Sequence, residues 1–476
     1  MIRRFAAAGL VAVATVAAAP FAAAQHYQSD FPPDEFQARW AKVLDRIGAD
    51  AVAIVQGAPL ARGFVYPRQT NEFYYLCGIE TAHSYILLDG RSKKATLYLP
   101  PRNERLERSE GRVLSADDGE LVRKLTGADE VKSTTEMAAA DWAASLGQVG
   151  AVYTPFMPAE GQGESRGELR AANAAVLNDP WDGRLSREAR FIELLRARFP
   201  RSEIRDLSPV LDELRSVKSP REIALVRRAS QLAGLGLMEA IRSTEPGVWE
   251  YQLDAAARYV FLINGARLEG YRSITASGTA NINNGHYFMN TRQLQDGDLV
   301  LMDFAPDYCY YTSDIGRVWP VNGTYAPWQR ELLQFILEYR NAVLARIRPG
   351  VSAKQIVDEV KTAMEPVLAR TTFSKPIYAA AARRLVETSG GSLSHGVGMA
   401  VHDVGSYRDL LKPGHVFSVD PQLWVPEENL YLRYEDTGVV TESGFENFTD
   451  FLPSELDDLE TLVREKGVVQ NVRREK

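Results

Sequence analysis

Residues 296–317 read DGDLVLMDFAPDYCYYTSDIGR and place two carboxylates around one predicted β-hairpin. An apolar run over Leu299–Met302 leads into Asp303, and an aromatic run over Tyr308–Tyr311 precedes Asp314. Two apolar runs around a Pro-Asp turn predict a hairpin, and the alternation along its strands lets both acids share one face. The simpler interpretation is that both acids are exposed turn residues. Residues farther along the chain decide between this interpretation and a shared site.

Three more chelating side chains follow, each within its own apolar segment: His395, Asp420 and Glu435. Hard or borderline divalent ions favour carboxylates with an occasional imidazole. Four acids and one histidine are too many acids for one zinc ion, and they suit two ions that share bridging carboxylates. Without cations such a cluster would repel itself, so clustering would itself indicate metal.

Histidine placement supports this interpretation. The chain has six histidines, and three of them border the acids: His286, His395 and His402. For any single one of them, a hydrogen-bonded structural histidine is the alternative.

Composition bounds the class of protein. At 476 residues the chain is long enough for two ordinary domains. Its 45% hydrophobic and 25% charged residues are typical of a globular protein. A net charge of −7 leaves no basic stripe, so no nucleic-acid partner is expected.

The first residues predict a signal peptide over 1–24. Arg3 and Arg4 precede an apolar run over 5–19, and an Ala-x-Ala site lies directly before Gln25. A membrane anchor is the weaker alternative because the run is short for a span. No later segment is long and apolar enough to cross a bilayer. We therefore expect an exported protein, periplasmic or secreted, with no membrane association after signal removal.

Residues 25–213 alternate apolar runs with helical patterns, which predicts an α/β domain. The expected strands are 51–55, 84–88 and 95–99, and the expected helices are 119–125, 136–146 and 187–199. The run GQGESRG over 161–167 lacks the spacing of a nucleotide loop and is predicted to be a surface loop. No residue of this domain is predicted to be catalytic.

A second domain over 214–476 is predicted to open with a capped helix at Ser219–Glu222. Inside it, Pro-Gly-Val occurs at 246–248 and again at 349–351, each time with glutamine four residues after the valine. The repeat is faint, and it fits a domain built from two related halves that pack a shared site between them.

Together these motifs resemble the aminopeptidase P and prolidase family of pita-bread metallopeptidases. The motifs are NGHY at 284–287, GDLVLMDF at 297–304, TSDIGR at 312–317, SHGVGMAVHD at 394–403, VDP at 419–421 and LRYED at 432–436, with YPRQTNEFYYLCGIE at 66–80 in the first domain. The resemblance covers nearly everything after the signal peptide.

The resemblance implies a creatinase-like α/β amino-terminal domain and an α+β pita-bread domain that holds two divalent ions. Manganese is the favoured ion, with zinc or cobalt as alternatives. Asp303 and Asp314 would bind the first ion. Asp314, His395 and Asp420 would reach the second ion or bridge, and Glu435 would bridge both. A homo-oligomer, dimer or tetramer, is also implied.

The implied reaction is hydrolysis of the bond before proline by water that the metals activate. His286 and His402 would position the substrate and stabilise the charge on its oxygen. Arg433 would lie near the proline pocket and the bridging acid, Trp424 would line that pocket, and Asp420 would bind metal and transfer protons.

Three positions depart from the family pattern. Asp420 stands where the family has glutamate, which is longer by about 1.5 Å of bond, whereas metal–ligand distances tolerate only about 0.2 Å. Gly391 stands where another histidine is usual, and Trp424 stands where tyrosine is usual.

The sequence therefore predicts an exported Xaa-Pro aminopeptidase that acts on peptides with proline in the second position. One alternative is a prolidase restricted to dipeptides. Another is a catalytically weakened metal- or peptide-binding relative, which the aspartate at 420 motivates. Non-peptide hydrolysis on the same fold ranks last, because creatine-cleaving relatives lack the metal-binding acids.

Overall fold

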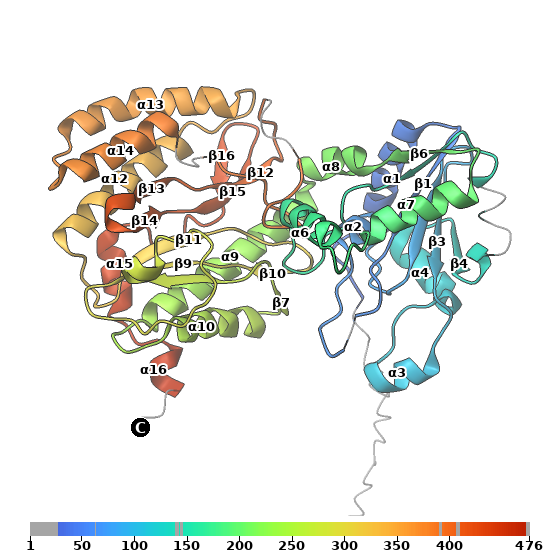
Figure 1. Cartoon of the computed structure of the whole chain (residues 1–476), viewed down its shortest axis with the longest axis horizontal. Coiled ribbons are helices and arrows are strands. Elements are labelled where there is room, and N and C mark those ends of the chain that lie inside the picture. The colour runs from blue at the N-terminus through green and yellow to red at the C-terminus, as the bar shows by residue number, and fades with distance from the viewer. Residues whose placement is uncertain are drawn as a thin grey trace, which may run out of the picture.

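The computed structural model describes residues 27–61, 63–138, 142, 146–389, 393–405 and 410–472. The predicted signal peptide and Gly391 lie outside these residues. The described chain forms two lobes that lie side by side (Figure 1). Across the described ranges, no helix combines the length and apolar character that crossing a membrane requires.

The amino-terminal lobe is built on one six-stranded sheet in the order β4-β3-β2-β1-β5-β6. The strands are β1 Ala51–Gln56, β2 Tyr85–Asp89, β3 Lys94–Leu99, β4 Glu130–Ser133, β5 Ala151–Thr154 and β6 Glu203–Asp206. Strands β1, β2 and β3 pair antiparallel, and the three outer pairings are parallel. The predicted α/β class and the three predicted strands of this lobe are confirmed.

The helices of this lobe are α1 Pro33–Ile47, α2 Asn71–Cys77, α3 Glu104–Glu110, α4 Gly119–Thr126, α6 Arg166–Asn178, α7 Arg187–Arg198 and α8 Ser208–Ser216, with short 3₁₀ turns η1 Ala116–Asp118 and η2 Glu136–Ala138. Among them, α1, α2 and α4 pack on one face of the sheet and α7 packs on the other. Alternate residues of β1 enter different cores, because successive strand side chains point to opposite faces. Ala53 packs with α1 and α2, whereas Ile54 packs with α7. The helix predicted over 136–146 falls partly outside the described residues.

In the carboxy-terminal lobe, strands lie between two groups of helices (Figure 1). The helices are α9 Pro220–Arg242, α10 Glu250–Ile263, α11 Gly278–Asn281, α12 Pro327–Leu344, α13 Ala353–Arg370, α14 Pro376–Thr388, α15 Leu456–Val463 and α16 Val468–Val472, with η3 Pro426–Glu428. Ser219 caps α9 as predicted, since its hydroxyl accepts from the N–H of Glu222, whose carboxylate accepts from the N–H of Ser219.

The strands of this lobe form small sheets that meet around one region. They are β7 Leu268–Glu269, β8 Ile274–Ser277, β9 Leu299–Asp303, β10 Pro306–Asp307, β11 Gly316–Pro320, β12 Val416–Val419, β13 Gln422–Val425, β14 Leu430–Arg433, β15 Asp436–Val440 and β16 Phe445–Asn447. The sheet orders are β11-β9-β8, β12-β15-β16, β13-β14 and β10-β7. Separate helices and antiparallel sheets confirm the predicted α+β class.

The faint Pro-Gly-Val repeat has a structural counterpart. Gly247 and Gly350 both have positive φ, 89° and 79°, which glycine adopts without strain. The N–H of Gly247 donates to Leu294 and that of Gly350 to Leu411, each over 2.9 Å, and each leucine N–H donates back to the valine after its glycine. The two segments therefore enter their helices in the same way, as expected of two related halves.

The predicted hairpin is wrong in its return strand. Strand β9 pairs antiparallel with β11, with Asp303 opposite Gly316, whereas residues 308–311 form a tight turn closed by two backbone hydrogen bonds. Positive φ at Cys309 and Tyr310, 52° and 71°, prevents a strand there. The aromatic run instead packs between the lobes, where the Tyr310 ring stacks on Tyr74 with centroids 3.5 Å apart.

Candidate metal centre and active site

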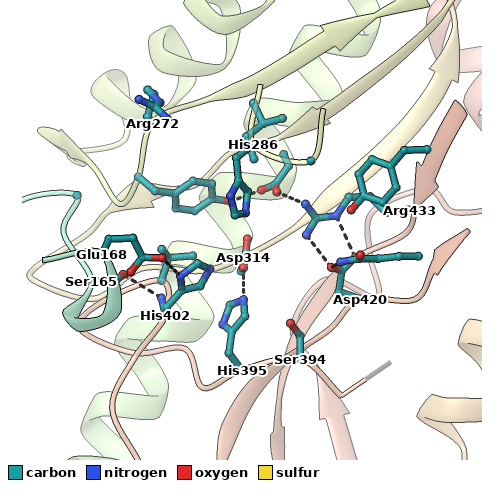
Figure 2. A pocket seen from close by; sticks show the side chains of 18 of the residues that line it. Ser165, Glu168, Arg272, His286, Asp314, Ser394, His395, His402, Asp420 and Arg433 are labelled. Atoms are coloured by element: carbon teal, nitrogen blue, oxygen red, sulfur yellow. Dashed lines mark hydrogen bonds and ion pairs between the residues drawn. The ribbon is translucent and has the colours of Figure 1, made fainter. Parts of the chain in front are cut away.

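Four of the five chelating side chains predicted from the sequence, Asp303, Asp314, His395 and Asp420, line one pocket (Figure 2). The fifth, Glu435, lies beside Asp314 and His395. Asp303 ends β9, Asp314 lies just before β11, and Asp420 follows β12. Glu435 lies between β14 and β15, where its backbone pairs with Gly316 at the start of β11. Antiparallel pairing of β9 with β11 thus brings Asp303 and Asp314 to the same end of a sheet.

Three of these residues form a group that could hold a metal ion. One donor atom each from Asp314, His395 and Glu435 lies within 4.8 Å of the other two. His395 Nε2 lies 3.2 Å from Asp314 Oδ2, and Figure 2 shows the ring pointing toward that carboxylate. Glu435 Oε1 is buried without a hydrogen-bond partner among the described residues. Such an oxygen fits a cation better than an apolar surrounding.

Asp303 and Asp420 face the same region from the side of Arg433. The Arg433 guanidinium donates from Nη1 to Asp303 Oδ2 over 2.7 Å. It also binds Asp420 through Nε and Nη2, each over 2.9 Å, and it contacts Glu435. Arg433 therefore lies among the acids and is their main positive partner among the described side chains. From the sequence, Arg433 was expected to lie near only one of these acids, the bridging residue Glu435.

The electrostatics of the cluster indicate a shortage of positive charge. Burial raises the pKa of Asp303 to about 8 even though Arg433 opposes the shift. Burial likewise raises the pKa values of Asp420 and Glu435. Burial also disfavours ionised Asp314, but the hydrogen bond and charge of His395 outweigh it and lower that pKa to about 2. Divalent cations would reverse the upward pKa shifts of Asp303, Asp420 and Glu435, because they favour ionised carboxylates.

His286 is exposed at the pocket, on a loop that one buried acid organises. Glu250, the first residue of α10, is fully buried and accepts hydrogen bonds from groups on both sides of His286. The donors are Ser277 N and Oγ, Asn281 Nδ2, Tyr287 Oη and Arg292 N, at 2.7–3.0 Å. No local pattern in the sequence marks Glu250 as a site residue, because its hydrogen-bond partners are distant in the sequence.

His402 lies between the other two histidines of the pocket. Its ring centroid is 4.3 Å from that of His395 and 6.3 Å from that of His286. Burial, with the charge of His395 second, lowers the pKa of His402. The structure therefore assembles the three histidines whose sequence positions border the acids.

The predicted surface loop over 161–167 is exposed at 162–164, whereas Ser165 and Arg166 are buried and α6 begins at Arg166. The segment also contributes to this pocket. Gly163, Ser165 and Glu168 line it. Glu168 Oε1 lies 2.7 Å from His402 Nδ1, and the backbone N–H of His402 donates to Ser165 Oγ over 3.2 Å. Glu168 and His402 are 234 residues apart in the chain, so no local pattern could reveal their contact.

One face of the β13–β14 hairpin forms the opposite wall. Trp424 pairs with Tyr431 and Gln422 pairs with Arg433 in the register of the two strands. Because strand side chains alternate, these four side chains share a face, and all of them line the pocket. The rings of Trp424 and Tyr431 stack with centroids 4.1 Å apart. The alternation along β13 therefore places Gln422 on the pocket face together with Trp424.

Two further pocket residues precede β8. Tyr271 donates from its hydroxyl to Asp303 Oδ1 over 2.6 Å. The next residue, Arg272, is exposed, and its guanidinium lies 4.1 Å from the centroid of the Phe288 ring. Figure 2 shows Arg272 at the edge of the pocket, apart from the acids. The pocket therefore has an acidic floor, an aromatic wall and a cation at its rim.

Comparison with known proteins agrees with this architecture. The profile of metallopeptidase family M24 matches residues 224–442, and that of the aminopeptidase P N-terminal domain matches residues 36–145. The chain is 31% identical to the Xaa-Pro aminopeptidase of Escherichia coli over 461 residues, 91% of this chain and 98% of that protein. It is 30% identical to the Xaa-Pro aminopeptidase of Haemophilus influenzae over 459 residues, 92% and 99% of the two chains.

Solved structures show the same likeness. Aminopeptidase P from E. coli with the inhibitor Pro-Leu superposes with a TM-score of 0.73 at 26% identity, covering 92% of this chain and 99% of that one. Proline aminopeptidase P II from Yersinia pestis gives a TM-score of 0.72 at 28% identity, covering 91% and 99%. The likeness spans both lobes.

Proposed function

This chain belongs to the aminopeptidase P family of M24 metallopeptidases, and from that premise we propose that it hydrolyses the bond between an N-terminal residue and proline. The predicted fold, an α/β aminopeptidase P amino-terminal domain followed by a pita-bread metallopeptidase domain, is confirmed. The observation that carries the proposal is the convergence of Asp314, His395 and Glu435 beside a pocket walled by Trp424.

M24 peptidases use divalent metals, usually as a pair, and the donor set of this chain fits such ions. When bound, the ions supply an activated water and polarise the scissile carbonyl. We propose that five residues hold them: Asp303, Asp314, His395, Asp420 and Glu435. Manganese is the proposed ion, and zinc or cobalt would also suit carboxylate and imidazole donors.

The remaining residues bind and orient the peptide. His286 and His402 lie on one side of the acids, where ring nitrogens can hydrogen-bond the peptide and stabilise charge on its oxygen. Trp424, 40% exposed and stacked on Tyr431, offers an aromatic surface to a proline ring. Arg433 orients the acids through its fixed fork of donors.

Specific observations motivate two other functions. Arg272 at the pocket rim could bind the free carboxylate of a dipeptide, as a prolidase requires. Asp420 is held by Arg433 and also accepts from Gln422, which suits a weakened metal- or peptide-binding relative. We favour the aminopeptidase because all five predicted chelating side chains are present and lie close together, with His286 and His402 beside them.

We also propose export and self-association. The residues before Gln25 support export by their charge and apolar pattern. Self-association is supported by exposed apolar side chains on both lobes: Phe64 and Val65 on one, Leu262 and Ile263 on the other. Surfaces of this kind commonly meet a second copy, and light scattering of the purified protein would report the assembly.

The proposed activity is tested by mass spectrometry of the manganese-loaded protein with Ala-Pro-Ala. Ala-Ala-Ala is the matched control, and a chelator-treated sample tests metal dependence. We expect release of alanine from the proline peptide only, and loss of that release with chelator. A folded, metal-loaded protein that leaves Ala-Pro-Ala intact would contradict the proposal and favour a binding role.

A further inference from the structure

His402 is the pocket histidine that the amino-terminal lobe holds from two sides. The Glu168 carboxylate is hydrogen-bonded to Nδ1 of His402 over 2.7 Å, and the Ser165 hydroxyl accepts a hydrogen bond from the backbone N–H of His402 over 3.2 Å. Figure 2 shows Ser165 and Glu168 coming from an amino-terminal segment and meeting His402 on the far side from Arg433. A ring that is held at both the backbone and one nitrogen has little freedom to rotate.

Both partners of this contact are anchored in one buried ionic cluster. Arg166, between Ser165 and Glu168, pairs with Glu72 over 2.7 Å and with Glu160 over 3.4 Å. Asp403, the residue after His402, pairs with Arg215 over 2.6 Å. Arg215 in turn pairs with Glu160 over 2.8 Å and with Glu72 over 3.2 Å.

This cluster joins the two lobes and fixes the distance between their segments. All five side chains are buried, and breaking a buried pair by removing one partner is strongly unfavourable. The backbone positions of the segments that carry Glu168 and His402 are therefore set by the docking of the lobes, and the exposed Glu168 side chain reaches His402 from that fixed backbone.

The contact also determines which ring nitrogen of His402 carries a proton. An ionised carboxylate only accepts hydrogen bonds, so Nδ1 must donate and Nε2 is left for the pocket. Burial raises the pKa of Glu168, but its own backbone N–H and His402 outweigh burial and bring the pKa below its usual value. Glu168 is therefore ionised at neutral pH and suited to this role.

We propose that Glu168 is a positioning residue, supplied by the amino-terminal lobe, that holds His402 as the Nδ1–H tautomer with Nε2 directed to the peptide. The inference rests on the proposed function for its kinetic consequence, but its structural part can be tested without turnover. On this view, the amino-terminal lobe completes the active site of the other lobe.

Kinetics with a proline peptide test the functional part. Glu168→Ala removes the acceptor, and we expect kcat to fall roughly 10- to 100-fold, as for outer partners of functional histidines, with little change in KM. Glu168→Gln retains an oxygen that can accept from Nδ1, so it should keep most of the rate that Glu168→Ala loses. Glu164→Ala is the matched control, since that carboxylate accepts from the backbone of Gly161.

The tautomer is measured directly by ¹H–¹⁵N correlation spectra of the imidazoles in zinc-loaded protein, because zinc is diamagnetic. The chain has only six histidines, and His402→Asn identifies the signal. We expect a protonated Nδ1 in the natural protein and in Glu168→Gln, and a shift toward protonated Nε2 in Glu168→Ala. This spectrum stays informative even if the protein fails to cleave proline peptides.

Either of two results would overturn the proposal. One is an unchanged His402 tautomer in a folded Glu168→Ala protein. The other is a rate loss that Glu164→Ala shares in full, which would indicate a general disturbance of the segment. Equal metal content and melting temperature in the variants exclude loss of the centre or of the fold as the cause.

Discussion

Arg433 binds Asp420 through two hydrogen bonds of equal length, Nε to Oδ1 and Nη2 to Oδ2, each 2.9 Å. Both groups are buried, and the same guanidinium reaches Asp303 over 2.7 Å. The fork of Arg433 thereby fixes the orientation of two carboxylates, Asp303 at the end of β9 and Asp420 just after β12.

Removal of this guanidinium should leave buried acids without a partner. We expect Arg433→Ala to lower the unfolding free energy of the metal-free protein by about 3–5 kcal/mol, and bound metal to restore part of that loss. Chemical denaturation with and without manganese measures both effects. Arg433→Lys is the control that keeps the charge but lacks the fork, and equal stability of that variant and the natural protein would contradict the geometric argument.

The metal-free protein should lose stability as pH rises from about 4 to 8. The folded pKa of Asp303 is raised to about 8, so the folded state keeps a proton that the unfolded state releases near pH 4. Stability then falls by up to about 1.4 kcal/mol per pH unit for one proton. The Asp314 pKa is lowered to about 2, so its stabilisation is lost only below pH 4 and does not offset this slope.

Denaturation of metal-free protein at several pH values measures that slope, and Asp303→Asn should flatten it. Manganese must displace the retained proton, so its affinity should rise over the same interval. A pH-independent affinity between pH 6 and 8 would count against protonated acids in the cluster.

Asp420 should be needed for the second ion. Asp420→Asn removes one negative charge at nearly constant shape, and we expect metal content to drop from two ions to one, with activity reduced by a factor of about 100 or more. Metal analysis after gel filtration and peptide cleavage report the two quantities. Asp420→Glu is the companion variant; it should still bind two ions, and a gain of orders of magnitude in its rate would show that aspartate weakens the natural enzyme.

Arg272 should contribute to recognition of the free carboxylate of short peptides. Because Arg272 is exposed, an ion pair there is worth at most about 1 kcal/mol, so Arg272→Ala should raise KM for Ala-Pro-Ala about two- to fivefold. The amide Ala-Pro-Ala-NH₂ lacks the carboxylate and should show no such change. Steady-state kinetics on the two peptides at low salt give the comparison, and equal effects on both would rule out a carboxylate contact.

Processing at the predicted signal site should leave Gln25 as the first residue of the mature protein. Expression in a bacterium that exports proteins, followed by intact-mass analysis of the periplasmic fraction, gives the mass directly. Substitution of Ala24 by a bulky residue should block cleavage, since the site requires small side chains. Retention of residues 1–24 in a cytoplasmic product would contradict the export proposal.

Local patterns in the sequence predicted much of the framework. Apolar runs located β1, β2 and β3, and the capping box at Ser219 located the start of α9. The acids and His395 were predicted because each lies within a short apolar segment that is typical of a strand. A side chain at the end of a strand lies at the edge of its sheet. Four of these five residues line one pocket and Glu435 lies beside Asp314 and His395, which agrees with the clustering expected from the sequence.

Contacts between distant segments were beyond such patterns. The return strand of the opening motif is β11 and not residues 308–311, because positive φ turns the aromatic run into the interface between the lobes. Glu250 organises the His286 loop through partners up to 42 residues away. Glu168 reaches His402 across 234 residues from a segment that reads as an ordinary polar loop.

By itself, the sequence determined which side chains can chelate metal and which local elements carry them, since propensity, capping and alternation act over a few residues. Only the tertiary structure decided that Arg433 lies among the acids and that Glu168 meets His402. Those contacts depend on how strands pair and how the two lobes dock, which are collective results of burying apolar surface and pairing buried charges along the whole chain.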